Sequence, residues 1–218
     1  MSCGLLTLSF AANALAADHD YVGVLSGLST LSADGRSEIS ASGTAVSLYK
    51  PENGPTLSVF VGRVLSNYLA LQANYGWNRN SLTLASVGYA AGRETAYEES
   101  RGSAQQSVWG DLLVYFRNRR SVVRPYLSVG TGVVYLSSSR VAVNHALNSP
   151  EMSPARFSFT GATLHVAVGI DVFHARGWSL RYSFSEAAQG NPISAQLNPP
   201  GQRGLKNFQN FFGLIRSF

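Results

Sequence analysis

Five polar or ionisable residues stand inside otherwise apolar segments and are best placed to do chemistry: Gln72, Asp111, His165, Asp171 and Arg181. Asp171 and Arg181 lie about equally far from a turn at Ala175–Arg176 and share parity. Residues placed in this way on two antiparallel strands face each other as a cross-strand pair. The spacing therefore predicts an ion pair between Asp171 and Arg181, with Asp111 nearby. Two unrelated charges on a solvated sheet are the alternative.

Catalysis would need a nucleophile beside a general base. His165 has Thr163 and Ser183 as potential neighbours, but no recognisable motif joins them. His145 and His174 fall in a predicted loop and a predicted turn. A polar side chain that fills an interior is the better interpretation of His165. We expect no catalytic residue, no cofactor and no metal site.

The polar residues alternate with apolar neighbours, which is typical of strands, because successive side chains of a strand point to opposite faces. The segment Tyr68–Asn78 shows the pattern most cleanly, with apolar Leu69 and Leu71 on one face and polar Gln72 and Asn74 on the other. Eight segments of strand length recur along the chain. They are Tyr21–Thr30, Thr56–Leu65, Tyr68–Asn78, Ser107–Phe116, Pro125–Leu136, Ser158–Val172, Trp178–Ser185 and Phe208–Phe218.

The connections between these segments alternate between long and short. Short turns follow the second, fourth and sixth segments, and Leu82–Leu84 can extend the third strand outward. The long connections are Ser32–Pro55, Arg79–Gln105, Ser137–Ala155 and Glu186–Gly204. Short turns on one side and long loops on the other are typical of barrels in a bacterial outer membrane. The sequence predicts an all-β fold, an eight-stranded antiparallel up-and-down transmembrane β-barrel.

The bulk composition agrees with strands in lipid. Charged residues are 13% of the chain and the mean hydropathy is +0.01, whereas a soluble domain usually carries nearly twice that charge. An arginine facing lipid at mid-membrane costs about 2–4 kcal/mol, so we expect Arg181 to point into the barrel and the apolar faces to point outward. The net charge of +5 is modest and scattered, which gives nucleic-acid binding little support.

The second segment has two mixed faces, so its orientation depends on the turn that follows. A two-residue turn at Ser66–Asn67 would pair Leu65 with Tyr68. This register predicts that Phe60 shares the apolar outer face and that Arg63 points inward.

The N-terminal residues resemble a secretory signal peptide. The segment Leu5–Ala17 is apolar and ends in small residues, as expected before a cleavage site, although no basic region precedes it. A buried first helix is the alternative. The only cysteine, Cys3, lies before the apolar run. We therefore expect residues 1–17 to be a signal peptide and residues 18–218 to form the barrel.

Aromatic residues gather where a membrane interface would lie. Tyr75, Trp77, Trp178 and Phe218 are candidates for the aromatic girdles of a membrane barrel. The segment Phe208–Phe218 also resembles the closing strand of bacterial outer-membrane barrels, whose end is read by the barrel-assembly machinery. A chance aromatic terminus is the alternative.

Taken with the strand pattern, the chain resembles the OmpA-like family of small outer-membrane barrels, together with opacity and OmpW-type barrels. The similar stretches are Phe60–Trp77, Gly169–Asp171 with Arg181–Phe184, and the closing strand. The resemblance implies a bacterial outer-membrane location and an interior ion-pair cluster to which Asp171 and Arg181 would belong. Gln72 stands where that family has a carboxylate, and Asp111 where it has a lysine.

The function that follows is a non-enzymatic outer-membrane barrel that displays loops and has at most a narrow pore. Its partners would be outer-membrane lipids and lipopolysaccharide, which the loop arginines would meet: Arg36, Arg93, Arg101, Arg140 and Arg203. Solvated loop charge is the simpler interpretation of these arginines.

Two other functions are compatible with such a pattern. The first is a lipid A deacylase-like enzyme on the same scaffold, which would carry His-x-Ser-Asn where this chain has Ser183–Glu186, so that the serine is kept and the histidine is replaced. The second is a secreted lipocalin-like carrier.

Overall fold

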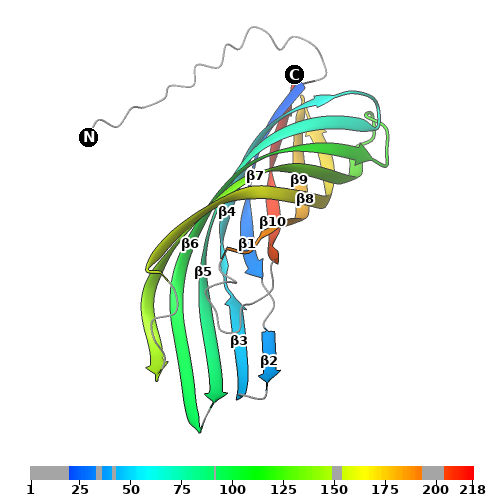
Figure 1. The fold of residues 1–218 in the computed structure, drawn as a ribbon. Coiled ribbons are helices and arrows are strands. Elements are labelled where there is room, and N and C mark those ends of the chain that lie inside the picture. Colours follow the sequence, from blue (N-terminus) through cyan, green and yellow to red (C-terminus); the bar gives the residue numbers. More distant parts are fainter. Residues whose placement is uncertain (1–19, 33–35, 41–42, 91, 149–153, 193–203) are drawn as a thin grey trace, which may run out of the picture.

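Alternating side chains produce ten antiparallel strands in the computed structural model, which describes residues 20–32, 36–40, 43–90, 92–148, 154–192 and 204–218 (Figure 1). The strands are β1 (Asp20–Ser32), β2 (Arg36–Ser40), β3 (Gly43–Pro51), β4 (Asn53–Val64), β5 (Leu69–Ala90), β6 (Arg93–Tyr115), β7 (Val123–Leu147), β8 (Arg156–Ala175), β9 (Trp178–Gly190) and β10 (Gly204–Ser217). The predicted signal peptide lies outside the described residues. No helix of the described part is long and apolar enough to cross a membrane.

Eight of the strands close into a ring. Its order is β5-β4-β1-β10-β9-β8-β7-β6, and the pairing of β5 with β6 completes the circle. All eight predicted strands are present in it, and each neighbouring pair is antiparallel. The prediction of an eight-stranded antiparallel barrel is confirmed. The hairpin of β2 and β3 adds to the outer part of β5 and lies outside this ring.

The barrel has its apolar face outside. Leu71, Val166 and Leu180 are 49%, 48% and 45% exposed, whereas Gln72 and Arg181 are 8% and 1% exposed. A soluble barrel would bury the first set and expose the second, because its apolar face fills the core. The expected orientation, with apolar side chains toward lipid and polar ones in the lumen, is therefore confirmed.

One side of the barrel extends far beyond the ring. Strands β5, β6 and β7 have 22, 23 and 25 residues, whereas β1 and β9 have 13 each. With β2 and β3 they form a curved sheet that projects past the short strands (Figure 1); we call this the extended sheet. The extension of β5 through Leu82–Leu84 is confirmed.

Three of the predicted long loops are instead largely strand: Ser32–Pro55, Arg79–Gln105 and Ser137–Ala155. Their polar sequences lack the apolar alternation that identifies a strand buried on one face. Pairing between β5 and β6 nevertheless continues without interruption to Ala90 and Arg93. The fourth loop is shorter than expected, because β9 runs to Gly190.

The predicted orientation of β4 was wrong. Leu65 N donates to Leu69 O at 2.9 Å, so the turn contains three residues, Ser66–Tyr68, instead of two. A shift of one residue moves every side chain of a strand to the other face. Phe60 is therefore buried in the lumen, and Arg63 points outward with 66% of its side chain exposed.

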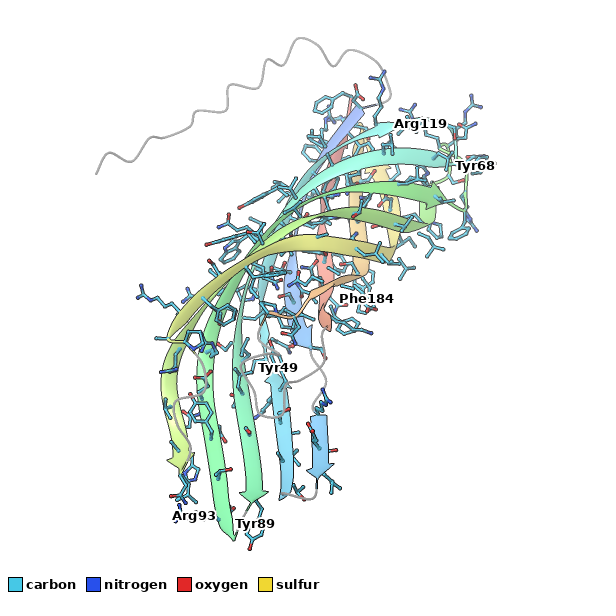
Figure 2. All side chains as sticks on the ribbon, in the orientation of Figure 1. Tyr49, Tyr68, Tyr89, Arg93, Arg119 and Phe184 are labelled. Carbon is cyan, nitrogen blue, oxygen red and sulfur yellow. The ribbon has the colours of Figure 1, made fainter. Side chains whose placement is uncertain are left out.

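The short turns gather at one end of the barrel, which we call the short-turn rim. Arg119 and Tyr68 lie at this rim, opposite the tip of the extended sheet that carries Arg93 (Figure 2). Phe218 N donates to Asp20 O at 3.0 Å, so both ends of the described chain also meet here. The two ends of the molecule therefore differ sharply in the length of strand that each presents.

Candidate functional site

All five predicted site residues lie in the lumen and are buried. Because they come from β5, β6, β8 and β9, the ring is needed to bring them together. With three neighbours they form one hydrogen-bonded group, which we call the lumen cluster: Gln72, Asn74, Trp109, Asp111, Tyr115, His165, Asp171 and Arg181. The three additional members share inward parity with their predicted neighbours, which is the signal that could have identified them.

The centre of the cluster is the predicted ion pair. Arg181 Nε and Nη2 donate to the two oxygens of Asp171 at 2.6 and 2.8 Å. Arg181 also donates to Gln72 Oε1 at 2.7 Å and to Tyr115 OH at 3.0 Å, and its guanidinium lies 4.7 Å from the ring centroid of Tyr126. A buried ion pair is tolerated only when its remaining hydrogen-bonding groups are also satisfied. This arginine meets that condition.

Asp111 belongs to a second centre in the same cluster. His165 Nδ1 lies 2.9 Å from Asp111 Oδ1, and Trp109 Nε1 donates to Oδ2 at 2.9 Å. Asn74 donates to the same oxygen at 3.1 Å and accepts from Gln72 at 2.6 Å. Asp111 is thus linked to the ion pair through two amide side chains.

An apolar layer fills the lumen on the other side of the cluster from the short-turn rim. Its buried members come from five strands: Leu31, Tyr49, Leu82, Leu84, Leu136 and Leu205. Burial raises the pKa of the Tyr49 hydroxyl, against the opposing effect of the charge on Arg101. We did not predict this layer, because the alternating pattern assigned the apolar side chains to the outer face of the barrel.

A second buried ionic group lies on the extended sheet, and we call it the outer ion cluster: Tyr97, Glu99, Arg101 and Arg140. Glu99 accepts from Arg101 Nη1 at 2.9 Å, from Arg140 Nε at 2.8 Å and from Tyr97 OH at 2.7 Å. The expectation that Arg101 is a solvated loop charge was wrong, because it is 1% exposed. Its guanidinium also lies 4.9 Å from the ring centroid of Phe157.

Comparison with known proteins identifies the group to which this barrel belongs. The family model for the outer membrane protein beta-barrel domain matches residues 3–207. The chain belongs to this family. No curated protein matches its sequence. The predicted resemblance to small outer-membrane barrels is therefore confirmed at the level of the family.

Solved barrels of the outer-membrane family share the fold at low sequence identity. Neisserial surface protein A aligns with a TM-score of 0.55 and 14% identity, covering 91% of this chain and 97% of that one. Ail, the attachment invasion locus protein of Yersinia pestis, aligns with a TM-score of 0.52 and 12% identity, covering 92% and 99%. At such identities the likeness concerns the fold alone.

This outer membrane barrel lies in the bacterial outer membrane. In such barrels the short turns face the periplasm and the long segments face the exterior. The short-turn rim is therefore the periplasmic end, and the tip of the extended sheet lies at the opposite end of the barrel.

The predicted girdle residues all face outward on this outer membrane barrel. Tyr75, Trp178 and Phe218 are exposed, and Trp77 is half-buried. Trp178 and Phe218 lie at the periplasmic end, where the guanidinium of Arg216 stands 5.4 Å from the Trp178 ring centroid. Of the remaining loop arginines, Arg36 and Arg93 are exposed, Arg140 is half-buried, and Arg203 lies outside the described residues.

The lumen of this outer membrane barrel offers little space for a reaction. Two cavities that border the lumen cluster measure about 20 and 10 Å³, close to the space that one water needs. Ser185, the serine of the deacylase-like position, is buried and donates to Gln209 Oε1 at 3.3 Å. Within the described residues no group of three His, Cys, Asp or Glu side chains gathers as a metal site.

Proposed function

We propose that this barrel is a non-enzymatic outer-membrane protein that displays its extended sheet to the exterior and is closed to solutes along its lumen. The observation that supports closure is the stacking of two filled levels across the lumen, the lumen cluster and the apolar layer. An eight-stranded barrel is just wide enough for its own side chains. Here the cavities beside the lumen cluster and between it and the apolar layer are only water-sized.

The two levels oppose ion passage for different physical reasons. In the lumen cluster the charges are already paired, so a passing ion would have to displace Asp171 from Arg181. In the apolar layer a hydrated ion would meet Leu82, Leu84 and Leu136, which are fully buried and offer it no polar group. Hydrophobic constrictions of this kind close pores by excluding water.

Display is supported by the size and position of the extended sheet. Its tip carries Tyr89 and Arg93 at the point farthest from the periplasmic end (Figure 2). Its outer face exposes Leu48 and Val87, and Arg36 is exposed on β2. Exposed arginines suit an anionic partner such as lipopolysaccharide. One solved neighbour, Ail, was crystallised with the heparin analogue sucrose octasulfate, which is also anionic.

Conductance in a planar lipid bilayer tests the closed lumen. We expect the refolded wild-type chain to give no discrete current steps. The double variant Leu82→Ala, Leu136→Ala removes bulk from the apolar layer, and the matched variant Leu48→Ala removes a similar side chain from the outer surface. Stable current steps from the wild-type protein would overturn the proposal of a closed lumen.

Incubation of the purified barrel with acyl-labelled lipid A tests the enzymatic alternative. We expect no released acyl chain, because Ser185 is buried in the lumen and its hydroxyl is engaged by Gln209. A Ser185→Ala variant serves as the control for any release that is observed. Release by the wild-type chain that this variant abolishes would replace the display function with lipid hydrolysis.

A further inference from the structure

A cavity of about 260 Å³ opens at the periplasmic end, below the lumen cluster, and no function described above uses it. Its charged lining consists of Asp20, Arg119, Arg124, Asp171 and Arg181. The cavity is many times larger than the share of one water in liquid, so it has room for a small ligand. The lining carries three cationic side chains and two anionic ones.

The anionic side chains of this cavity are already engaged elsewhere. Asp171 accepts from Arg181 through both oxygens, and Oδ2 also accepts from Tyr115 OH at 2.9 Å. Asp20 lies 3.8 Å from Arg63 on the outer wall. Neither carboxylate forms an ion pair with Arg124 among the described residues.

Arg124 is therefore a cation with unused donors. Although it is in register with Asp171 across β7 and β8, its only hydrogen bond in the described part of the chain runs from Nη2 to Asn67 O at 3.2 Å. Its guanidinium stacks on the Tyr115 ring at 3.7 Å from the centroid. Its Nε is buried and has no partner. Arg124 Nη1 also donates to no acceptor among the described residues, and an anion in the cavity would supply one.

The position of the cavity indicates which anion is available. Phe173 and Phe218 line it and are both exposed at the periplasmic rim, where aromatic residues of membrane barrels meet the lipid headgroups. Phosphate is the anionic group at that level. Its several oxygens also match the fork of donors on a guanidinium. We propose that the cavity between Arg124 and Arg119 binds a phosphate group.

The phosphate can belong to a phospholipid headgroup or to free inorganic phosphate, and two arms of one experiment separate these sources. In the first arm, the full chain in a maltoside detergent is titrated with inorganic phosphate at constant ionic strength, balanced with chloride. The Nε–H signal of Arg124 is followed by ¹⁵N–¹H NMR. In the second arm, the same signal is compared in nanodiscs of phosphatidylglycerol and of a phosphate-free glycolipid.

We expect a saturable shift of the Arg124 signal with phosphate. A matching shift in phosphatidylglycerol without added phosphate would assign the site to a lipid headgroup, and its absence there would assign it to free phosphate. Both results support the proposal. A shift that chloride reproduces, or no shift in either arm, would overturn it.

Variants provide a second measurement by titration calorimetry with inorganic phosphate. Arg124→Gln is expected to weaken binding at least tenfold, and Arg124→Lys, which keeps the charge but loses the fork, several-fold. Arg120→Gln removes an equal charge from the exposed turn nearby and should leave the affinity within twofold. Equal losses in Arg120→Gln and Arg124→Gln would contradict a specific site. Migration of unboiled samples on gels checks that each variant is folded, and the wild-type NMR result stands without them.

Discussion

The barrel contains two buried arginine–carboxylate groups that use the same chemistry in different surroundings. In the lumen cluster, Arg181 and Asp171 lie on strands whose outer faces contact lipid. In the outer ion cluster, Arg101 and Glu99 lie on the extended sheet, which we propose is displayed to the exterior solvent. The first pair was predicted and the second was not. Lipid imposes an apolar alternation that reveals which side chains point inward, whereas a solvated sheet imposes none.

The same difference should appear in how each group supports the structure. The ring is closed, so loss of its central ion pair is expected to weaken every strand together. The extended sheet joins the ring through continuations of its strands and through the apolar layer, and its outer ion cluster lies beyond that layer, so loss of its ion pairs is expected to act locally.

The largest effect is expected from Arg181→Met. The substitution leaves Asp171 buried without its cation, which costs about 3–5 kcal/mol. Urea unfolding of the barrel from lipid vesicles measures this loss. The double variant Arg181→Met, Asp171→Leu removes both charges and should recover most of the stability. A single variant within about 1 kcal/mol of wild type would contradict a structural role for the pair.

Two matched substitutions on the outer surface should give the next largest difference in stability. Val129 and Leu48 are 51% and 57% exposed, but Val129 faces lipid in the ring and Leu48 lies on the extended sheet. Val129→Arg should destabilise the barrel by about 2–4 kcal/mol. Leu48→Arg should stay within about 0.5 kcal/mol. Unfolding from vesicles measures both free energies. Equal losses of stability would indicate that Val129 and Leu48 face the same surroundings.

A smaller and local effect is expected from Glu99→Gln. It removes the carboxylate shared by Arg101 and Arg140, at a cost of about 1–3 kcal/mol. Hydrogen exchange should accelerate in residues 93–104 and 138–147 and stay unchanged in the ring. The neighbouring variant Glu98→Gln is the control, since Glu98 is only half-buried. Faster exchange throughout the ring would show that the two regions are not independent.

The smallest effect on stability is expected from Phe218→Ala. Phe218 is exposed at the periplasmic rim, so unfolding from vesicles should change by less than about 1 kcal/mol. We propose that the barrel-assembly machinery contacts this end of the closing strand. The amount of assembled barrel in cells, measured as heat-modifiable protein in the membrane fraction, should then fall several-fold. Unchanged assembly would argue against that contact.

The sequence alone determined the parts of the molecule where one face of a strand meets lipid. The eight ring strands, the outward orientation of Leu71 and Leu180, and the pairing of Asp171 with Arg181 all follow from a period of two. A charge or amide that interrupts such a pattern near mid-membrane is stabilised when it points inward, because lipid cannot solvate it.

The tertiary structure decided what depends on register and on polar strands. A turn one residue longer than expected reversed β4 and moved Arg63 outside. Register shifts between β6 and β7 beside Glu99 and Arg101 help set the outer ion cluster, and the period-two pattern of a strand does not reveal such bulges. The unpaired donors of Arg124 likewise depend on the tertiary structure, because its cross-strand partner Asp171 accepts from Arg181 and Tyr115 instead. Each of these outcomes depends on which distant strand lies alongside, and a periodic pattern within a single strand carries no information about that partner.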